Sequence, residues 1–254
     1  MTSQPHTRTT ESDLSVYPSE DGHVGARRST GAAVADRLDG HREPRDLRRP
    51  DDGLDTPAQT VDAGIADPAP LGLAAFALTT FVLSVFNAGI ISNLELEGVV
   101  LPIALFYGGL AQLLAGMWEF KKGNTFGATA FTSFGAFWLS YAAYAEFVLP
   151  GIEEQPDAYK ATGLFLLAWT IFAAMMFFAA VRISGALGVV FATATSAFVL
   201  LTLGTLLQDD SLTKLGGIMG LVTAGAAWYT AWAGILNDAW KRTVLPVFEV
   251  KHRS

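Results

Sequence analysis

Six long stretches of this chain contain no charged residue and are apolar for almost their whole length. Each has at least 21 residues, and none includes Asp, Glu, Lys, Arg or His. At a rise of about 1.5 Å per residue, a helix of that length crosses the roughly 30 Å hydrocarbon core of a bilayer. The stretches are residues 71–91, 98–118, 125–145, 161–181, 183–207 and 215–237. The sequence therefore predicts an all-α integral membrane protein with six transmembrane helices.

Membrane-spanning strands do not fit this pattern. A barrel strand shows about ten residues that alternate between apolar and polar, whereas these stretches are apolar on every side and about twice as long. Within lipid, a helix satisfies all of its own backbone hydrogen bonds, which an isolated strand does not. Short polar connections at 121–124 and 208–211 separate consecutive stretches, so neighbouring helices should run antiparallel.

The first 66 residues differ in character from the rest of the chain. They hold eight arginines and twelve acidic residues, and Tyr17 is their one aromatic residue. Such a segment cannot bury enough apolar surface to offset the entropy lost on ordering. We predict a disordered cytoplasmic tail over 1–66, a six-helix membrane domain over 67–246 and a short cytoplasmic tail over 247–254. The chain has no cysteine, which excludes disulfides and thiol chemistry.

Basic residues near the ends of the predicted helices indicate the orientation. One side would carry seven of them, and the other side would carry Lys160 and Lys214. The seven are Lys121, Lys122, Arg182, Lys241, Arg242, Lys251 and Arg253. Because the side richer in Lys and Arg stays in the cytoplasm, both termini are predicted to be cytoplasmic, in a multi-pass protein of the cell membrane.

The chain shows no constellation of catalytic or metal-binding residues. Its four histidines all lie in the predicted tails, at His6, His23, His41 and His252. No glycine-rich phosphate loop follows a strand, and no nucleophile is paired with a base. We therefore expect no enzymatic activity, no metal, no cofactor and no nucleic-acid partner.

Polar side chains inside the apolar stretches are the candidates for contact with a solute. Hydroxyls and amides can line a path for a small polar molecule without the cost of a buried charge. The candidates are Asn87, Tyr107, Gln112, Thr129, Thr132 and Ser133. Ser and Thr also bond to carbonyls of their own helix, and the two amides serve equally well as links between helices. Gly216, Gly220 and Ala224 recur every four residues, a spacing that favours close helix packing.

Several motifs in one order resemble the acetate uptake transporter family, which includes bacterial succinate–acetate permeases. Residues 67–73 read Asp-Pro-Ala-Pro-Leu-Gly-Leu, close to the family signature Asn-Pro-Ala-Pro-Leu-Gly-Leu. Its defining positions here are Asp67, Pro68, Pro70 and Gly72. Further matches lie at 106–112, 119–127, 129–135 and 242–246, so the resemblance covers 67–246. Asp67 replaces the signature Asn and is expected to cap the first helix, with Pro68 in the first turn.

The resemblance implies a six-helix protomer in the lipid bilayer, commonly in a homo-hexamer, with a solute path inside each protomer. It implies uptake of acetate, related short monocarboxylates or succinate, often described as proton-linked. In relatives the path narrows at a Phe, here Phe76, together with a Tyr and a Leu. This chain has Phe134 at the Tyr position and Ala194 near the Leu position, which implies a wider and less polar neck.

Two other functions fit the same sequence. An uncharged path with acidic residues at its outer mouth also suits a passive channel for a small neutral solute such as urea or ammonia. The long tail suits a membrane scaffold or sensor that does not transport. If transport is proton-linked, the acid itself must carry the proton, or groups at the mouths must exchange it. The candidates at the mouths are Glu119, Arg182 and Glu146.

Overall fold

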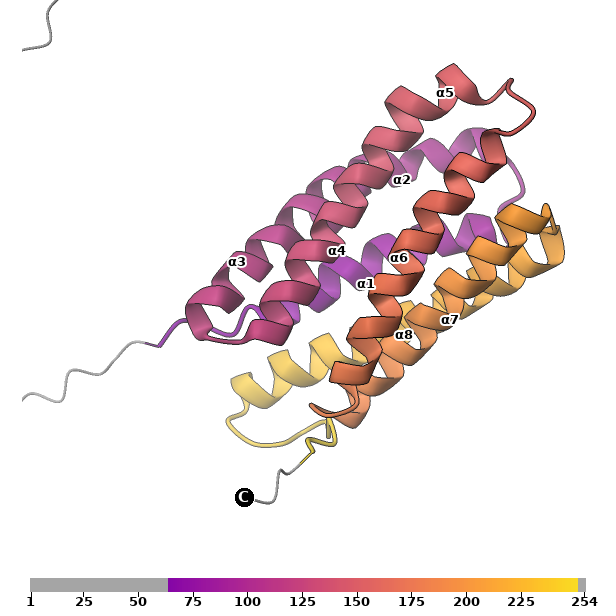
Figure 1. Ribbon diagram of the computed structural model, residues 1–254. Helices are drawn as coiled ribbons and strands as arrows, with labels where there is room; N and C mark the ends of the chain where they lie inside the picture. The colour runs from indigo at the N-terminus through magenta and orange to yellow at the C-terminus, as the bar shows by residue number, and fades with distance from the viewer. Residues whose placement is uncertain (1–63, 251–254) are drawn as a thin grey trace, which may run out of the picture. The chain divides into compact units, whose positions relative to one another are not determined.

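The computed structural model describes residues 64–250, which are helical almost throughout (Figure 1). The elements are α1 (Ala69–Asn87), η1 (Leu94–Val99), α2 (Val100–Ile103), η2 (Ala104–Ala111), α3 (Gln112–Lys122), α4 (Thr125–Ala143), η3 (Tyr144–Val148), α5 (Leu149–Ile152), α6 (Ala158–Ala180), α7 (Gly185–Leu207) and α8 (Asp210–Ala239). The predicted tail falls almost wholly on residues 1–63, and the end of the C-terminal tail on 251–254. Both lie outside the described residues.

These elements form six long helical segments. The π-helical stretches η2 and η3 continue neighbouring α-helices, so that α2–η2–α3 and α4–η3–α5 are each one segment. Five segments are long and apolar enough to cross a membrane. The remaining segment is α4–η3–α5. Its first part, α4, carries no charged residue but contains Gly, Thr and Ser residues. Between 64 and 250 the β-structure is one isolated bridge, Ser184 to Glu249, and the prediction of an all-α membrane fold is confirmed.

The helix ends follow from local side chains. Asn124 and Ser184 cap α4 and α7 by accepting hydrogen bonds from the backbone N–H groups of Gly127 and Leu187. Asp209 caps α8 in the same way, accepting from two backbone N–H groups. Such caps satisfy N–H groups that a helix start leaves without partners. The polar connections noted in the sequence therefore form tight turns that fix where each helix begins.

The beginning and the end of α1 differ from the sequence expectation. The helix ends at Asn87 rather than at residue 91, because Gly89 takes a left-handed conformation with φ of +71°. At the other end, the predicted cap on Asp67 is wrong, since Pro68 occupies the cap position. The Asp67 carboxylate still accepts a hydrogen bond of 3.0 Å from the Ala69 N–H.

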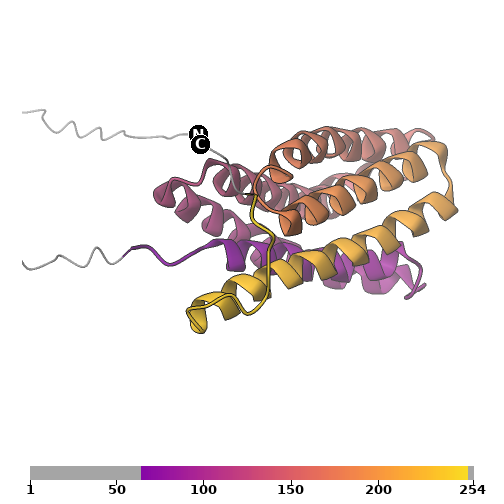
Figure 2. The ribbon, with the colours of Figure 1, turned by 90° about the horizontal axis from the view of Figure 1, so that it is seen from below.

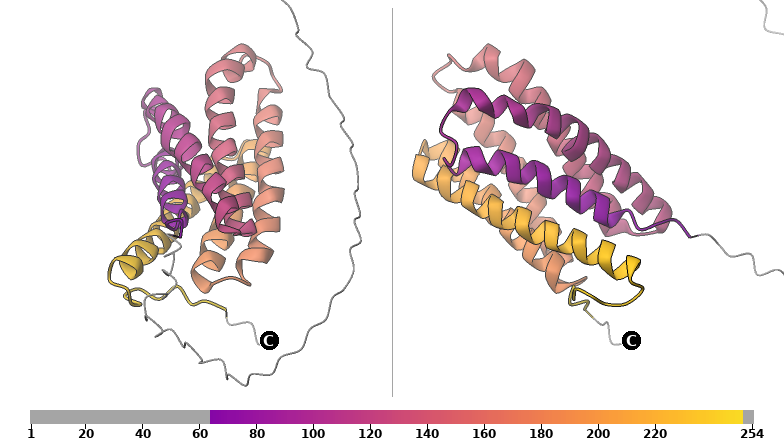
Figure 3. Two further views of the ribbon diagram at one scale, coloured as in Figure 1. Left: turned by 90° about the vertical axis from the view of Figure 1, so that its left-hand side faces the viewer. Right: turned by 180° about the vertical axis from the view of Figure 1, so that it is seen from behind.

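Small residues bring α8 close to α1, and the views in Figure 3 agree on this neighbourhood. A Cβ atom on Gly217 would collide with the backbone of Asn87 and Ala88, and one on Gly220 would collide with the side chain of Ser84. Ala224, one turn further along, is fully buried. The predicted close packing of Gly216, Gly220 and Ala224 is confirmed, although Gly216 packs against Leu201 of α7 and not against α1.

The start of α1 and the end of α8 lie at the same end of the helical unit (Figure 1). Lys122, at the end of α3, bonds Asp67 at 2.7 Å and so ties α3 to the start of α1. The segment after α8 crosses to the start of α7 (Figure 2), where the N–H groups of Gly185 and Ala186 donate to the carbonyls of Phe248 and Val247. Asn237 holds the intervening turn, because its side chain bonds the backbone of Val244 and Leu245.

Candidate functional site

Two cavities lie within the helical unit, and both are lined by Phe76 of α1 and Ala194 of α7. The first has a volume of about 400 Å³, and we call it the Glu97 cavity after its one acidic lining residue. The second has a volume of about 440 Å³, and we call it the Gln112 cavity. Because the same two residues line both cavities, Phe76 and Ala194 mark the boundary between them.

Aromatic rings fill this boundary. Phe134 of α4 is 3% exposed, and its ring centroid lies 5.3 Å from that of Phe76. The same ring contacts Phe191 and Phe198 of α7, at centroid distances of 6.0 and 6.3 Å. These two residues flank Ala194 by one helical turn on either side. We call Phe76, Phe134, Phe191 and Phe198 the aromatic layer.

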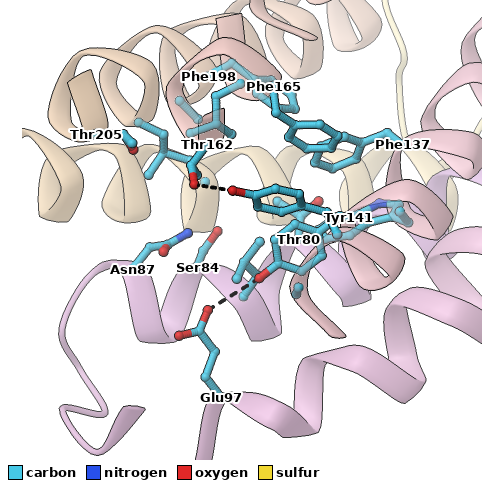
Figure 4. A pocket seen from close by; sticks show the side chains of 18 of the residues that line it. Thr80, Ser84, Asn87, Glu97, Phe137, Tyr141, Thr162, Phe165, Phe198 and Thr205 are labelled. Carbon is cyan, nitrogen blue, oxygen red and sulfur yellow. Dashed lines mark hydrogen bonds between the residues drawn. The ribbon is translucent and has the colours of Figure 1, made fainter. Parts of the chain in front are cut away.

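The Glu97 cavity is lined by hydroxyls and by one carboxylate among aromatic and aliphatic walls (Figure 4). The Tyr141 hydroxyl donates to Glu97 Oε1 at 3.4 Å, and the hydroxyls of Tyr144 and Thr162 lie 2.6 Å apart. Its other polar lining residues are Thr80, Ser84, Asn87, Thr205, Thr213 and Thr223. No lysine, arginine or histidine of the described chain lines it.

The Gln112 cavity has a different polar lining. It includes the Asp67–Lys122 ion pair and the amides of Gln112, Asn124 and Asn237. Gln112 is 1% exposed, and its Oε1 atom has no hydrogen-bond partner among residues 64–250. Buried polar atoms are normally hydrogen-bonded, so this oxygen is an exception in the described part of the chain. Ser184, Val247 and Glu249 line the same cavity, which brings the segment after α8 to its edge.

Glu119 lies behind this cavity rather than in solvent. It is 0% exposed, and one carboxylate oxygen accepts a hydrogen bond of 2.8 Å from Asn124 Nδ2. The other two groups considered for proton exchange, Arg182 and Glu146, are exposed and line neither cavity. Of the three, Glu119 alone is buried next to a cavity-lining residue.

The structure brings the three expected constriction residues together and places several other candidates at the cavities. Phe76, Phe134 and Ala194 meet at the boundary, while Asn87 lines the Glu97 cavity and Gln112 lines the Gln112 cavity. Of the signature residues, Asp67 and Pro70 line the Gln112 cavity. Pro68 is buried at the start of α1, and Gly72 lets the ring of Phe131 approach the helix backbone.

The remaining polar candidates lie away from both cavities. Tyr107 and Thr129 line no described cavity, and Thr132 and Ser133 line a separate hollow between α4 and α6. Thr132 also packs against Gly116 of α3. On α4 the side of the helix that carries Phe134 and Phe137 faces the cavities, so these threonines and Ser133 project in other directions.

Sequence reasoning missed the polar groups that meet in the Glu97 cavity, Tyr141, Tyr144, Thr162 and Glu97 itself. A signal for the two tyrosines was present, because Phe134, Phe137, Tyr141 and Tyr144 follow one another at helical spacing. No comparable pattern marks Glu97, which lies in the 3-10 helix η1 between two long segments.

Comparison with known proteins agrees with this architecture. Residues 54–252 match the model of the GPR1/FUN34/yaaH family. The chain belongs to the GPR1/FUN34/yaaH family. It is 40% identical over 185 residues to the succinate-acetate/proton symporter SatP of Escherichia coli, covering 73% of this chain and 96% of that protein. It is 41% identical over 177 residues to the ammonia transport outward protein 2 of Saccharomyces cerevisiae, covering 67% of this chain and 61% of that protein.

A solved structure of the bacterial acetate channel SatP is also similar. It has a TM-score of 0.65 and 39% identity, and the match covers 72% of this chain and 99% of that one. These findings confirm the resemblance read from the motifs. The GPR1/FUN34/yaaH family includes the SatP symporter and the SatP acetate channel, and this chain is a multi-pass membrane transport protein and not an enzyme.

Proposed function

We propose that this chain carries acetate and related short carboxylates, including succinate, through a path inside each protomer. The path would run from the Glu97 cavity through the aromatic layer to the Gln112 cavity. The observation that carries the proposal is the pair of cavities that share Phe76 and Ala194 within one chain of this family. The activities of the similar SatP proteins support the substrate class.

Polar side chains in the Glu97 cavity suit a carboxyl group. Ser84, Asn87 and Thr205 are among its lining residues. Each can donate a hydrogen bond to a solute oxygen. Between the cavities, the aromatic layer offers no polar group, so a solute that crosses it must shed most of its water.

The outward surface of the helices supports the proposed location. Leu164, Leu167, Ile171, Met175 and Phe178 form an exposed apolar stripe along α6, as expected for a surface that faces lipid or a neighbouring copy in a homo-oligomer. We place both termini in the cytoplasm, because Lys122, Arg182 and the segment after α8 gather at one end of the unit. The Glu97 cavity then opens toward the outside.

Reporter fusions test this orientation. A reporter attached after Ser254 should show cytoplasmic activity, and one inserted into the 153–157 connection should show external activity, because basic residues hold their end of the helices inside. Alkaline phosphatase and a fluorescent protein, each fused at both positions, give opposite readouts. Equal activity of one reporter at both positions would contradict the orientation.

Solute uptake in vesicles tests the substrate. Full-length protein reconstituted into liposomes should accumulate labelled acetate and succinate well above empty liposomes, and deletion of residues 1–66 should leave the flux intact. If the acid carries its own proton, flux should fall as pH rises and should change little with membrane potential. A current that persists at high pH would instead identify an anion channel.

The alternative is a passive channel for a neutral solute such as urea or ammonia. It is favoured by the Glu97 cavity, in which no described basic residue is present to attract an anion. The same vesicles, loaded with a pH dye for ammonia or tested for urea-driven swelling, separate the two functions. Urea or ammonia flux without acetate flux would replace the proposed carboxylate transport.

A further inference from the structure

Glu97 brings a carboxylate into a cavity whose other lining residues carry no charge at neutral pH. It comes from η1, the 3-10 turn that leads directly into α2, and its side chain reaches toward α4 (Figure 4). The distance of 3.4 Å from the Tyr141 hydroxyl is longer than the usual 2.7–2.8 Å of an O–H···O bond. The phenol therefore holds Glu97 Oε1 only weakly. The second oxygen, Oε2, takes no hydrogen bond from any described residue.

No basic residue between 64 and 250 lines the cavity beside this carboxylate. On α1, the polar residues that face it are the uncharged Ser84 and Asn87, and on η3 the Tyr144 hydroxyl is occupied by Thr162. Glu95, on η1 itself, is exposed and does not line the cavity. Neither basic residue at this end lines the cavity: side-chain carbons of Lys214 lie near Gly89, and Lys160 pairs with Asp157 at 2.6 Å.

A carboxylate anion in this cavity would meet a second negative charge among apolar walls, where like charges repel strongly. An undissociated acid meets a better match. Its O–H group can donate to the Glu97 carboxylate, and its C=O group can accept from the hydroxyl of Ser84 or the amide of Asn87, which line the same cavity. Hydrogen bonds to a charged acceptor are about twice as strong as neutral ones.

We propose that Glu97, supported by Tyr141, makes this cavity bind a carboxylic acid together with one proton shared between the two carboxyl groups. The complex is the same whether the solute or Glu97 brings the proton. Binding of an acetate anion therefore takes one proton from solution, and no covalent bond changes. The inference rests on the proposed carboxylate transport and assigns its proton requirement to one residue.

Calorimetry on the purified full-length protein tests the assignment. Acetate is titrated at pH 7 in buffers of different ionisation enthalpy, and the slope gives the protons taken up per acetate bound. The wild-type protein should take up about one proton for each acetate in the Glu97 cavity. Glu97→Gln should take up close to none, because the neutral amide can donate to the anion. Its acetate uptake into liposomes should also become much less dependent on pH between 5 and 8.

Two variants serve as controls. Glu95→Gln removes an exposed carboxylate from the same 3-10 helix and should leave the proton uptake unchanged. Glu97→Asp keeps a carboxyl group on a shorter arm and should retain proton uptake with weaker binding. If Glu97→Gln cannot be recovered folded, Tyr141→Phe should raise the KM for acetate roughly threefold at unchanged kcat, because the carboxylate loses the long hydrogen bond that orients it.

Equal proton uptake by the wild type and Glu97→Gln would overturn the inference while leaving carboxylate transport in place. An unchanged KM in Tyr141→Phe would count against the pairing in the same way. A wild-type protein that moves no acetate or succinate would instead overturn the proposed function, and the role of Glu97 with it.

Discussion

Replacement of Phe76 with alanine should raise succinate uptake about tenfold relative to acetate uptake, which corresponds to about 1.4 kcal/mol of barrier. The Phe76 ring lines both cavities and is only 6% exposed. Its removal would join cavities of about 400 and 440 Å³ and leave a wider opening for the longer dicarboxylate. Uptake of both labelled acids into liposomes, at equal protein density, measures the change.

Removal of the Phe76 ring should also change how readily water fills the neck between the two cavities. A narrow hydrophobic neck excludes water when it is empty, and smaller side chains allow water to fill it. Phe76→Ala should therefore also increase osmotic water permeability of the same liposomes. Phe134→Ala is a second test of the layer, but this ring contacts six other aromatic rings. A cavity at that position can cost about 3–5 kcal/mol, so Phe134→Leu is the safer variant.

Phe131→Ala is the matched control. This residue lies one turn before Phe134 on α4, is also buried, and lines the Gln112 cavity but not the Glu97 cavity. It loses the same volume without opening the boundary, so its effect should be on stability and not on size selectivity. Unchanged selectivity in the Phe76 and Phe134 variants would remove the aromatic layer from the path.

The helices could be predicted from the sequence because membrane insertion is decided by length and charge. Runs without ionisable residues must be helical in lipid, and α6 and α7 lie where their apolar runs placed them. The turn before α4 was also readable, because Gly123 supplies a left-handed residue and Asn124 a cap. The end of α1 could not be predicted from the sequence, because the apolar run continues to Ile91, past the left-handed Gly89.

The site was less readable, because it depends on which way each side chain points. Tyr107 and Thr129 are polar residues in apolar runs, just as Gln112 is, yet only Gln112 reaches a cavity. Glu119 was expected at a mouth, but the structure buries its carboxylate against Asn124. The crossing of the segment after α8 to α7 depends on backbone hydrogen bonds between residues about 60 positions apart, which no local pattern reveals.

The other large effect concerns the contact between α8 and α1, the helix that carries Phe76. Helix association in lipid depends on close backbone approach at small residues. Gly217 faces the backbone of Ala88, which cannot move aside without displacing α1. Gly217→Val should therefore destabilise the protein by about 3 kcal/mol and leave little folded protein after detergent extraction. Gel filtration and thermal unfolding in detergent measure the loss.

A series of valine substitutions on α8 separates this packing from helix propensity. Gly220 faces the side chain of Ser84, which can change rotamer, so Gly220→Val should be damaging but less so than Gly217→Val. Gly225 lies on the same helix with no atom near its missing Cβ, and Gly225→Val should be close to neutral. All three changes give α8 the same residue type, so equal losses would point to propensity and would contradict the assigned α1–α8 packing. Losses of stability that decrease in the order Gly217, Gly220, Gly225 would show that contact with α1 determines the cost of each substitution. The position of Phe76 on α1 would then depend on these glycines.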